Sequence, residues 1–236
     1  MFHFPRPPVL HDIEASYKRS TVMRDMSSLR KSVDIVVIDD KPFSAENNLK
    51  NSGFKITVLR DILQIVEIAD YSIILCDVNG VGVALSEETQ GAYVIEEIKK
   101  TYPEKIVIAY TAGSAVSKLV QRAQSKADGY LRKDASIEDW RDMLDQKIAQ
   151  LADPIVTWKQ LRLRLLSKDI ELVDLLELEK VYLKNIKNGI AKAREKMQAE
   201  LNATRTGGAW TGELAKFLAS KAFDLALSAS VDSIAG

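Results

Sequence analysis

The sequence predicts an α/β protein: a doubly wound sheet of five parallel strands, followed by an α-helical C-terminal region. Three observations indicate this. Five short runs of apolar, mostly β-branched residues recur between residues 33 and 134, and a helical pattern follows each of them. The runs are apolar almost throughout, as is typical of parallel strands that helices cover on both faces of a sheet. Beyond residue 153 the apolar side chains recur only at helical spacing.

The expected elements alternate in order along residues 33–151. Gly53 ends the first helix, and Ser136, with Asp139 three residues later, is typical of the start of the fifth. A long loop is expected after the third strand, from Val78 to about Gly91. Right-handed crossovers connect such strands. The strands are expected at 33–40, 55–61, 71–77, 105–113 and 128–134, and the helices at 41–54, 62–70, 92–103, 114–127 and 136–151.

Three parts are expected along the chain: an N-terminal arm over residues 1–32, an α/β domain over 33–152 and a helical region over 153–236. The arm opens with a proline-rich stretch that cannot be helical throughout. Asp153 and Pro154 suit the start of a new helix, as its capping residue and its first helical residue. The apolar stripes then predict a helix from 154, a longer helix over 169–201 and a last one over 213–234.

The composition excludes several classes of site. Cys76 is the only cysteine, so no internal disulfide forms, and this fits a reducing compartment. The only histidines, His3 and His11, lie in the arm, which excludes a histidine-based triad or metal site elsewhere. No signal peptide or membrane span is visible, so a cytoplasmic location is expected. Residues 33–153 hold 14 Lys and Arg against 20 Asp and Glu, which argues against a nucleic-acid surface there.

Side chains that carry chemistry lie at the ends of four of the five expected strands. Asp39 and Asp40 end the first strand, Asp77 the third and Thr111 the fourth, and Lys133 belongs to the fifth. Ligands of open α/β sheets bind outside the carboxyl ends of the strands, so these groups should meet at one edge. Carboxylates placed so closely repel each other and favour a cation among them. Oxygen ligands without histidine or thiolate point to Mg²⁺, and Mg²⁺ beside a lysine suits a phosphoryl group.

Four segments carry a specific resemblance. IVVIDD, ILCDVN, AYTA and GYLRK, in this order on successive strands, resemble the receiver domain of two-component response regulators. The resemblance covers about residues 33–152, and it implies a flavodoxin-like receiver fold that here carries an all-helical C-terminal extension.

The resemblance also implies roles for individual residues. Asp77 matches the aspartate that accepts the phosphoryl group. Asp39 and Asp40 match the acidic pair that holds Mg²⁺, with Asp40 as the direct ligand, and Asn79 matches the position whose main-chain carbonyl completes the metal shell. The remaining matches are Thr111 and Lys133, which contact the phosphoryl group, and Tyr130, the aromatic residue that turns inward on activation.

The implied chemistry is transfer of a phosphoryl group from a histidine kinase or a phosphotransfer protein to Asp77. Such a protein promotes only its own phosphorylation and dephosphorylation, so it is not expected to be an enzyme acting on other substrates. Two features depart from the family pattern. The loop VNGVGVALSEETQG lacks the usual Met-Pro and is longer, and Asp134 replaces the proline that usually follows the lysine.

Three functions remain open for the chain, and the first two differ in the role of the helical region. A dimerisation or docking module is the preferred interpretation, and it implies a homodimer or a downstream protein partner. A DNA-binding regulator with an atypical helical output is the second, although Arg162 and Arg164 make no basic stripe and nucleic acid is not the expected partner. A receiver that is never phosphorylated is the third. A phosphatase of the haloacid-dehalogenase type is excluded, because it needs Asp-x-Asp on its first strand.

Overall fold

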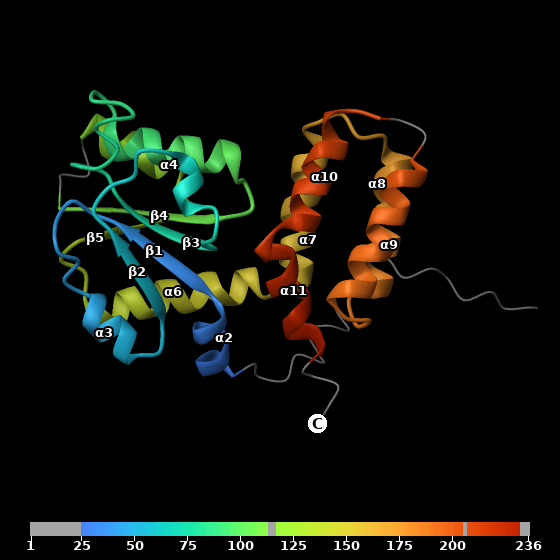
Figure 1. Cartoon of the computed structure of the whole chain (residues 1–236), viewed down its shortest axis with the longest axis horizontal. Coiled ribbons are helices and arrows are strands. Elements are labelled where there is room, and N and C mark those ends of the chain that lie inside the picture. The colour runs from blue at the N-terminus through green and yellow to red at the C-terminus, as the bar shows by residue number, and fades with distance from the viewer. Residues whose placement is uncertain (1–24, 113–116, 205–206, 232–236) are drawn as a thin grey trace, which may run out of the picture. The chain divides into compact units, whose positions relative to one another are not determined.

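The computed structural model describes residues 25–112, 117–204 and 207–231 (Figure 1). These residues form two compact units, one over 25–149 and one from Gln150 onward, and each is described by itself. Most of the arm predicted for residues 1–32 lies outside the described residues. Its end forms helix α2, Met26–Ser32, whose first backbone N–H groups donate to the Asp25 carboxylate.

The first unit, called the sheet unit below, is built on five parallel strands. They are β1 Asp34–Ile38, β2 Lys55–Leu59, β3 Ile73–Asp77, β4 Ile106–Thr111 and β5 Gly129–Arg132. Their order is β2-β1-β3-β4-β5. This is the flavodoxin-like order, in which ligands bind at the carboxyl ends of the strands near the point where the strand order reverses. The predicted fold class is confirmed.

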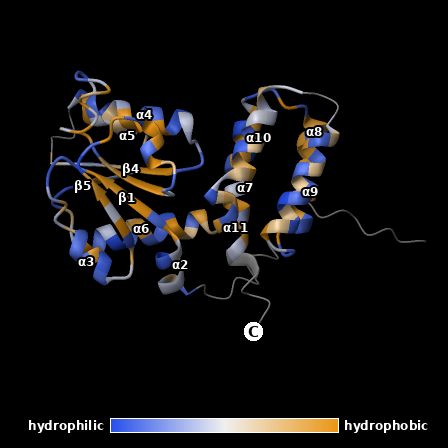
Figure 2. Cartoon of the chain, in the orientation of Figure 1, coloured by the Kyte–Doolittle hydropathy of each residue, from blue (hydrophilic) through white to orange (hydrophobic). Residues whose placement is uncertain are grey.

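Helices cover both faces of this sheet (Figure 1). The second expected helix is only a short 3₁₀ turn, η1, in which Gln64 and Glu67 form a reciprocal capping box. Alternate strand residues face a core with η1, α4 and α5, while Trp140 of α6 packs on the other face against Tyr110. Figure 2 shows strands β1 and β4 as largely hydrophobic. The elements are α3 Glu46–Asn51, η1 Ile65–Ile68, α4 Gln90–Thr101, α5 Lys118–Lys126 and α6 Ile137–Leu151.

Arg30 attaches α2 to the sheet unit. Its guanidinium donates to both carboxylate oxygens of Asp145 on α6, at 2.7 and 2.5 Å, and to the Ser52 carbonyl at 2.9 Å. It also lies 4.7 Å from the centroid of the Phe54 ring. A bidentate pair of this kind fixes orientation as well as distance, so residues 25–32 belong with the sheet rather than with a separate arm.

The second unit, called the helical unit below, contains helices only within 150–204 and 207–231. Its core is lined by aromatic side chains, among them Trp158, which stacks on Tyr182 at 4.7 Å between ring centroids. Asp153 caps the first of these helices, as expected, by accepting from the N–H groups of Ile155 and Val156. The helices are α7 Pro154–Leu166, α8 Leu172–Asn185, α9 Ile190–Ala203, α10 Ala209–Ala219 and α11 Lys221–Val231.

Two helix predictions in this unit are wrong. The long helix expected over 169–201 is two helices, α8 and α9, with a turn between them in which Gly189 has a φ of 83°. The last helix, expected over 213–234, is also divided, because Ser220 has an extended backbone and ends α10. In both cases the apolar stripe continues across the break, since the residues on each side face one core. Among the described residues, no helix has the length and apolar character needed to cross a membrane.

Candidate functional site

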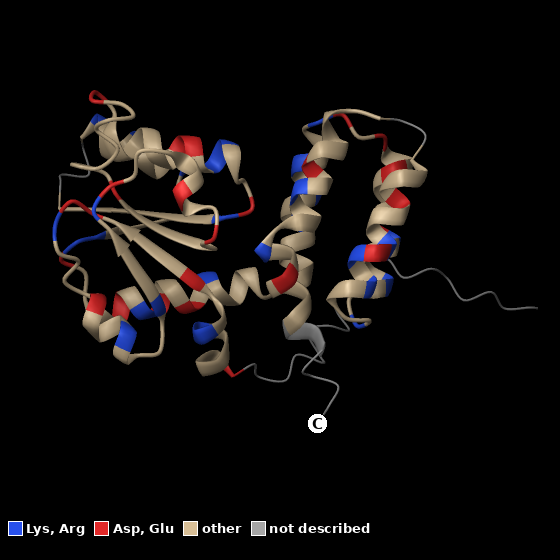
Figure 3. Cartoon of the chain, viewed as in Figure 1, with Lys and Arg blue, Asp and Glu red and all other residues tan. Residues whose placement is uncertain are grey.

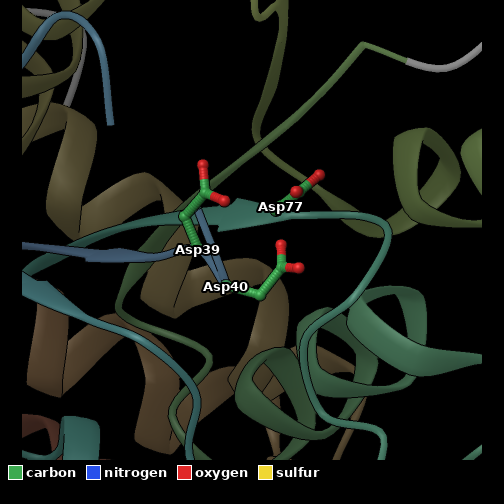
Figure 4. A group of neighbouring side chains, drawn as sticks. All are labelled: Asp39, Asp40 and Asp77. Atoms are coloured by element: carbon green, nitrogen blue, oxygen red, sulfur yellow. The ribbon is translucent and has the colours of Figure 1, made fainter. Parts of the chain in front are cut away.

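Three carboxylates meet at the carboxyl edge of the sheet, beside the ends of β1 and β3 (Figure 4). Asp39 and Asp40 follow β1, Asp77 is the last residue of β3, and one carboxylate oxygen from each lies within 4.8 Å of those of the other two. Asp39 and Asp77 are buried, with 1% and 3% of their surface exposed, whereas Asp40 is exposed. The parallel register dictates this meeting, because strands β1 and β3 are neighbours and end at the same level.

Lys133 supplies the positive charge nearest to the two buried carboxylates. Its ammonium lies 2.5 Å from an oxygen of Asp77 and 3.0 Å from Asp39. Its backbone N–H donates to the Thr111 carbonyl at 3.1 Å, which continues the pairing of β4 with β5 by one residue. The peptide bond to Asp134 is trans. Replacement of the usual proline therefore leaves the ammonium at the site.

Thr111 and Asn79 close one side of the same site. Thr111 ends β4 and is buried, and the Asn79 side-chain amide donates to its hydroxyl oxygen at 2.7 Å. The backbone N–H of Asn79 donates to the Asp77 carboxylate at 3.2 Å. The sequence suggested a role only for the main-chain carbonyl of Asn79, but its side chain also joins two strand ends.

Burial and Lys133 act in opposite directions on Asp77. Burial raises the pKa of Asp77, while hydrogen bonds from Lys133 and from the Asn79 backbone lower it, and the net pKa is above the usual range. Burial lowers the pKa of Lys133, but its hydrogen bonds to Asp77 and Asp39 outweigh burial, so the net pKa is raised. The lysine therefore stays charged, and the Asp77 carboxylate remains a costly group to keep ionised.

A pH-dependent change in stability is expected from the raised pKa of Asp77. Such a group stabilises the fold fully below its unfolded pKa and loses that contribution as the pH rises through its folded pKa. In EDTA at pH 7.5 we therefore expect Asp77→Asn to be more stable than the wild type by about 1 kcal/mol. The gain should vanish near pH 3. Urea denaturation at both pH values measures it, and a less stable variant at pH 7.5 would contradict the electrostatic argument.

The glycine-rich loop after Asp77 approaches the site closely. Gly80 has a φ of 86°, and a Cβ at this position would lie 2.8 Å from the Asp40 carboxylate. Its N–H donates to the Gln90 side chain at 2.8 Å, and the N–H of Gly82 donates to Asp61 at 2.6 Å. The loop is thus held by two side chains that sequence reasoning did not single out. The position of Asp61 in the sequence could have indicated this role, because Asp61 ends the second expected strand.

Of two tyrosines on the neighbouring strands β4 and β5, Tyr110 contacts the carboxylate cluster and Tyr130 does not. Tyr130 is half-buried and packs against the core under α5, and its hydroxyl is buried without a hydrogen-bond partner among the described residues. It is not part of the carboxylate cluster. Tyr110 was not predicted, yet its hydroxyl donates to Asp39 at 2.9 Å. Burial, followed by the charge of Asp39, raises the pKa of Tyr110 far above its usual value, so the phenol stays protonated.

No family model and no curated protein matches the sequence. Among solved structures, the chain is similar to a response regulator receiver domain protein (CheY-like) from Methanospirillum hungatei JF-1, at 18% identity and a TM-score of 0.43, over 50% of this chain and 94% of that one. It is similar to the receiver domain of NtrX from Brucella abortus, at 18% identity and a TM-score of 0.41, over 49% of this chain and 98% of that one. It is also similar to a response regulator from Thermotoga maritima, at 17% identity and a TM-score of 0.40, over 50% of this chain and 98% of that one.

These similar structures are receiver domains or response regulators, and they match about half of the chain. Within 154–204 and 207–231, the chain forms helices. The strand order of the sheet unit itself establishes the flavodoxin-like, doubly wound fold that the sequence predicted.

The donor atoms at the strand ends suit a hard divalent cation. Oxygen ligands are those that Mg²⁺ prefers, and it usually binds through one or two carboxylates while keeping several waters. Asp40 is exposed, so water can reach the cluster from its side. Among the described residues, the ammonium of Lys133 is the charge that offsets the two buried carboxylates. The donor atoms of these residues are therefore of the kind that Mg²⁺ binds.

Proposed function

We propose that this chain is a two-component response regulator in which Asp77 accepts a phosphoryl group from a phosphohistidine of a histidine kinase or a phosphotransfer protein. The observation that carries the proposal is the cluster at the sheet edge. An acceptor carboxylate, two further carboxylates, a lysine and a buried threonine lie together there, in the order and on the strands that the resemblance requires.

The transfer step uses the Asp77 carboxylate as nucleophile. One of its oxygens forms a bond to phosphorus while the bond between phosphorus and the donor imidazole nitrogen breaks, and the imidazole leaves with the electron pair. Lys133, now 2.5 Å from Asp77, would turn its ammonium to the oxygens of the transferred group. The Thr111 hydroxyl, which accepts from Asn79 in this structure, would donate to another of these oxygens.

Mg²⁺, held by Asp39, Asp40, Asp77 and the main-chain carbonyl of Asn79, would neutralise charge on the phosphoryl oxygens. The protein's own residues then govern the response to phosphorylation. Movement of Thr111 toward the phosphoryl group would vacate space beside β5, where the ring of Tyr130 lies half-buried. A local change of charge thereby biases the face formed by α5, β5 and α6 between two arrangements.

The helical unit is the proposed output, through dimerisation or contact with a downstream protein. Acidic and basic residues are interspersed along its described helices rather than gathered in a basic stripe (Figure 3). The described part also contains helices only, without the strand hairpin of a winged-helix DNA-binding domain. A protein partner therefore fits these helices better than DNA.

The deciding experiment is modification of the full chain by acetyl phosphate in Mg²⁺, followed by intact-mass spectrometry. The wild type should gain one phosphoryl group, and Asp77→Asn should gain none. Asp134→Asn is a matched control, because this neighbouring carboxylate is exposed and pairs with Arg132, and it should be modified like the wild type. A wild-type chain without Mg²⁺-dependent modification would be a receiver that is never phosphorylated.

A further inference from the structure

Tyr110 contacts the candidate metal site from the opposite face of the sheet to α4 and α5. It is the residue before Thr111 in β4, its backbone pairs with Asp77 in the sheet register, and its side chain is fully buried. Its hydroxyl lies 2.9 Å from an oxygen of Asp39 and donates to it. The side chain of Tyr110 therefore packs on the face of the sheet that α6 covers, and its hydroxyl reaches a carboxylate of the metal site.

The ring of Tyr110 is fixed by two other aromatic rings. Phe43, in the segment that follows Asp39 and Asp40, lies 5.7 Å from it between centroids, and Trp140 of α6 lies 5.4 Å away at a near-perpendicular angle. The Lys133 ammonium lies 5.4 Å from the same ring centroid. Packing of this kind restricts the ring, so the hydroxyl is held in place before any ligand arrives.

The hydrogen bonds of Asp39 show how much the hydroxyl contributes. One carboxylate oxygen accepts from the Lys41 backbone N–H at 2.9 Å, and Lys133 lies 3.0 Å from the carboxylate. Without the Tyr110 hydroxyl, Lys133, which Asp77 shares, would be the one partner of the second oxygen among the described residues. The orientation of Asp39 would then follow the lysine, which itself has to move when a phosphoryl group arrives.

We propose that Tyr110 is a positioning residue that holds the Asp39 carboxylate for binding of the divalent cation. This inference rests on the proposed function. Residues that hydrogen-bond the groups holding a metal commonly change its affinity by 10-fold to 100-fold when they are removed. The Tyr110→Phe substitution keeps the ring and its packing and removes only the hydroxyl, so we expect it to weaken Mg²⁺ binding about tenfold.

The test is calorimetric titration of the full chain with Mg²⁺, together with a thermal melt in EDTA. Tyr182→Phe is the matched control, because this buried tyrosine of the helical unit also donates one hydrogen bond of 2.9 Å, to the Pro154 carbonyl. It should lower the melting temperature and leave Mg²⁺ affinity unchanged. A merely structural Tyr110 would behave in the same way as this control.

Each outcome has one meaning. Unchanged Mg²⁺ affinity in Tyr110→Phe, with a wild type that binds Mg²⁺ and accepts phosphoryl groups, overturns this inference alone. A wild type that binds no Mg²⁺ overturns the proposed function together with it. If Tyr110→Phe does not fold, Phe43→Leu decides instead, because it loosens the ring and leaves the hydroxyl. It should weaken Mg²⁺ binding about twofold to threefold, and an unchanged affinity would count against the role of Tyr110.

Discussion

Replacing Gly91 with alanine should lower the free energy of unfolding of the sheet unit by about 3 kcal/mol, the upper range for overpacked sites. A Cβ at Gly91 would lie 1.9 Å from the Asp77 carbonyl oxygen and 3.0 Å from the Val78 Cα. Both are backbone atoms, so no side-chain rotation relieves the overlap. Helix α4 would have to move away from the end of β3, which carries the proposed acceptor.

Gly212 provides the matched control for this substitution. It lies within α10, and a Cβ there would meet nothing within 4 Å. Alanine is favoured over glycine inside helices, so Gly212→Ala should stabilise the helical unit by up to about 1 kcal/mol. Hydrogen exchange in urea, followed separately over α4 and α10, measures both effects. If Gly91→Ala lowered the free energy of unfolding only slightly, α4 would approach β3 less closely than it does in this structure.

The sheet and the strand-end residues could be predicted from sequence because both depend on local patterns and on order. Parallel strands end at one edge, so knowing that Asp39, Asp77 and Thr111 each follow an apolar run was enough to expect them together. No distance was needed for that inference. Lys133 follows β5 at the carboxyl ends of the strands, and its long side chain reaches past β4 to the carboxylates that end β1 and β3.

The contacts of Tyr110, Asp61 and Gln90 could not be predicted, because each depends on how loops and helices close over the sheet. Tyr110 lies in an apolar strand, and the alternation of side chains places it on the face opposite to Thr111. This pattern does not indicate which residue its hydroxyl contacts. The break between α8 and α9 was missed for another reason. Its apolar stripe keeps a helical spacing through Ile186, and the one local signal was the Asn-Gly pair that ends at Gly189.

Replacing Lys133 with methionine should destabilise the sheet unit by about 3 kcal/mol in EDTA at pH 7.5. The side chains of Asp77 and Asp39 are only 4% and 2% exposed, and Lys133 is the ammonium that pairs with both. Removing one partner of a buried pair leaves the other charge without compensation. This result would be opposite in sign to that expected for Asp77→Asn, which removes a buried charge and leaves the lysine paired with Asp39.

Lys99→Met is the control for the loss of a half-buried lysine. Its side chain is as exposed as that of Lys133, 22% against 24%. Its ammonium pairs with Asp128, which is 28% exposed, and also donates to the Lys105 carbonyl at 2.8 Å. Water therefore screens the charge that remains, and the loss should be near 1 kcal/mol.

The pH dependence separates charge from packing. Lys133 lowers the pKa of Asp77 against the effect of burial, so that pKa should rise further in Lys133→Met. The destabilisation should then be full above this pKa and fade as the pH falls through it, because the protonated carboxyl no longer needs a cation. Urea denaturation at pH 7.5 and pH 4 provides the comparison. An equal loss at both pH values would mean that methionine disturbs packing, and that the lysine is not the counter-charge of the two buried carboxylates.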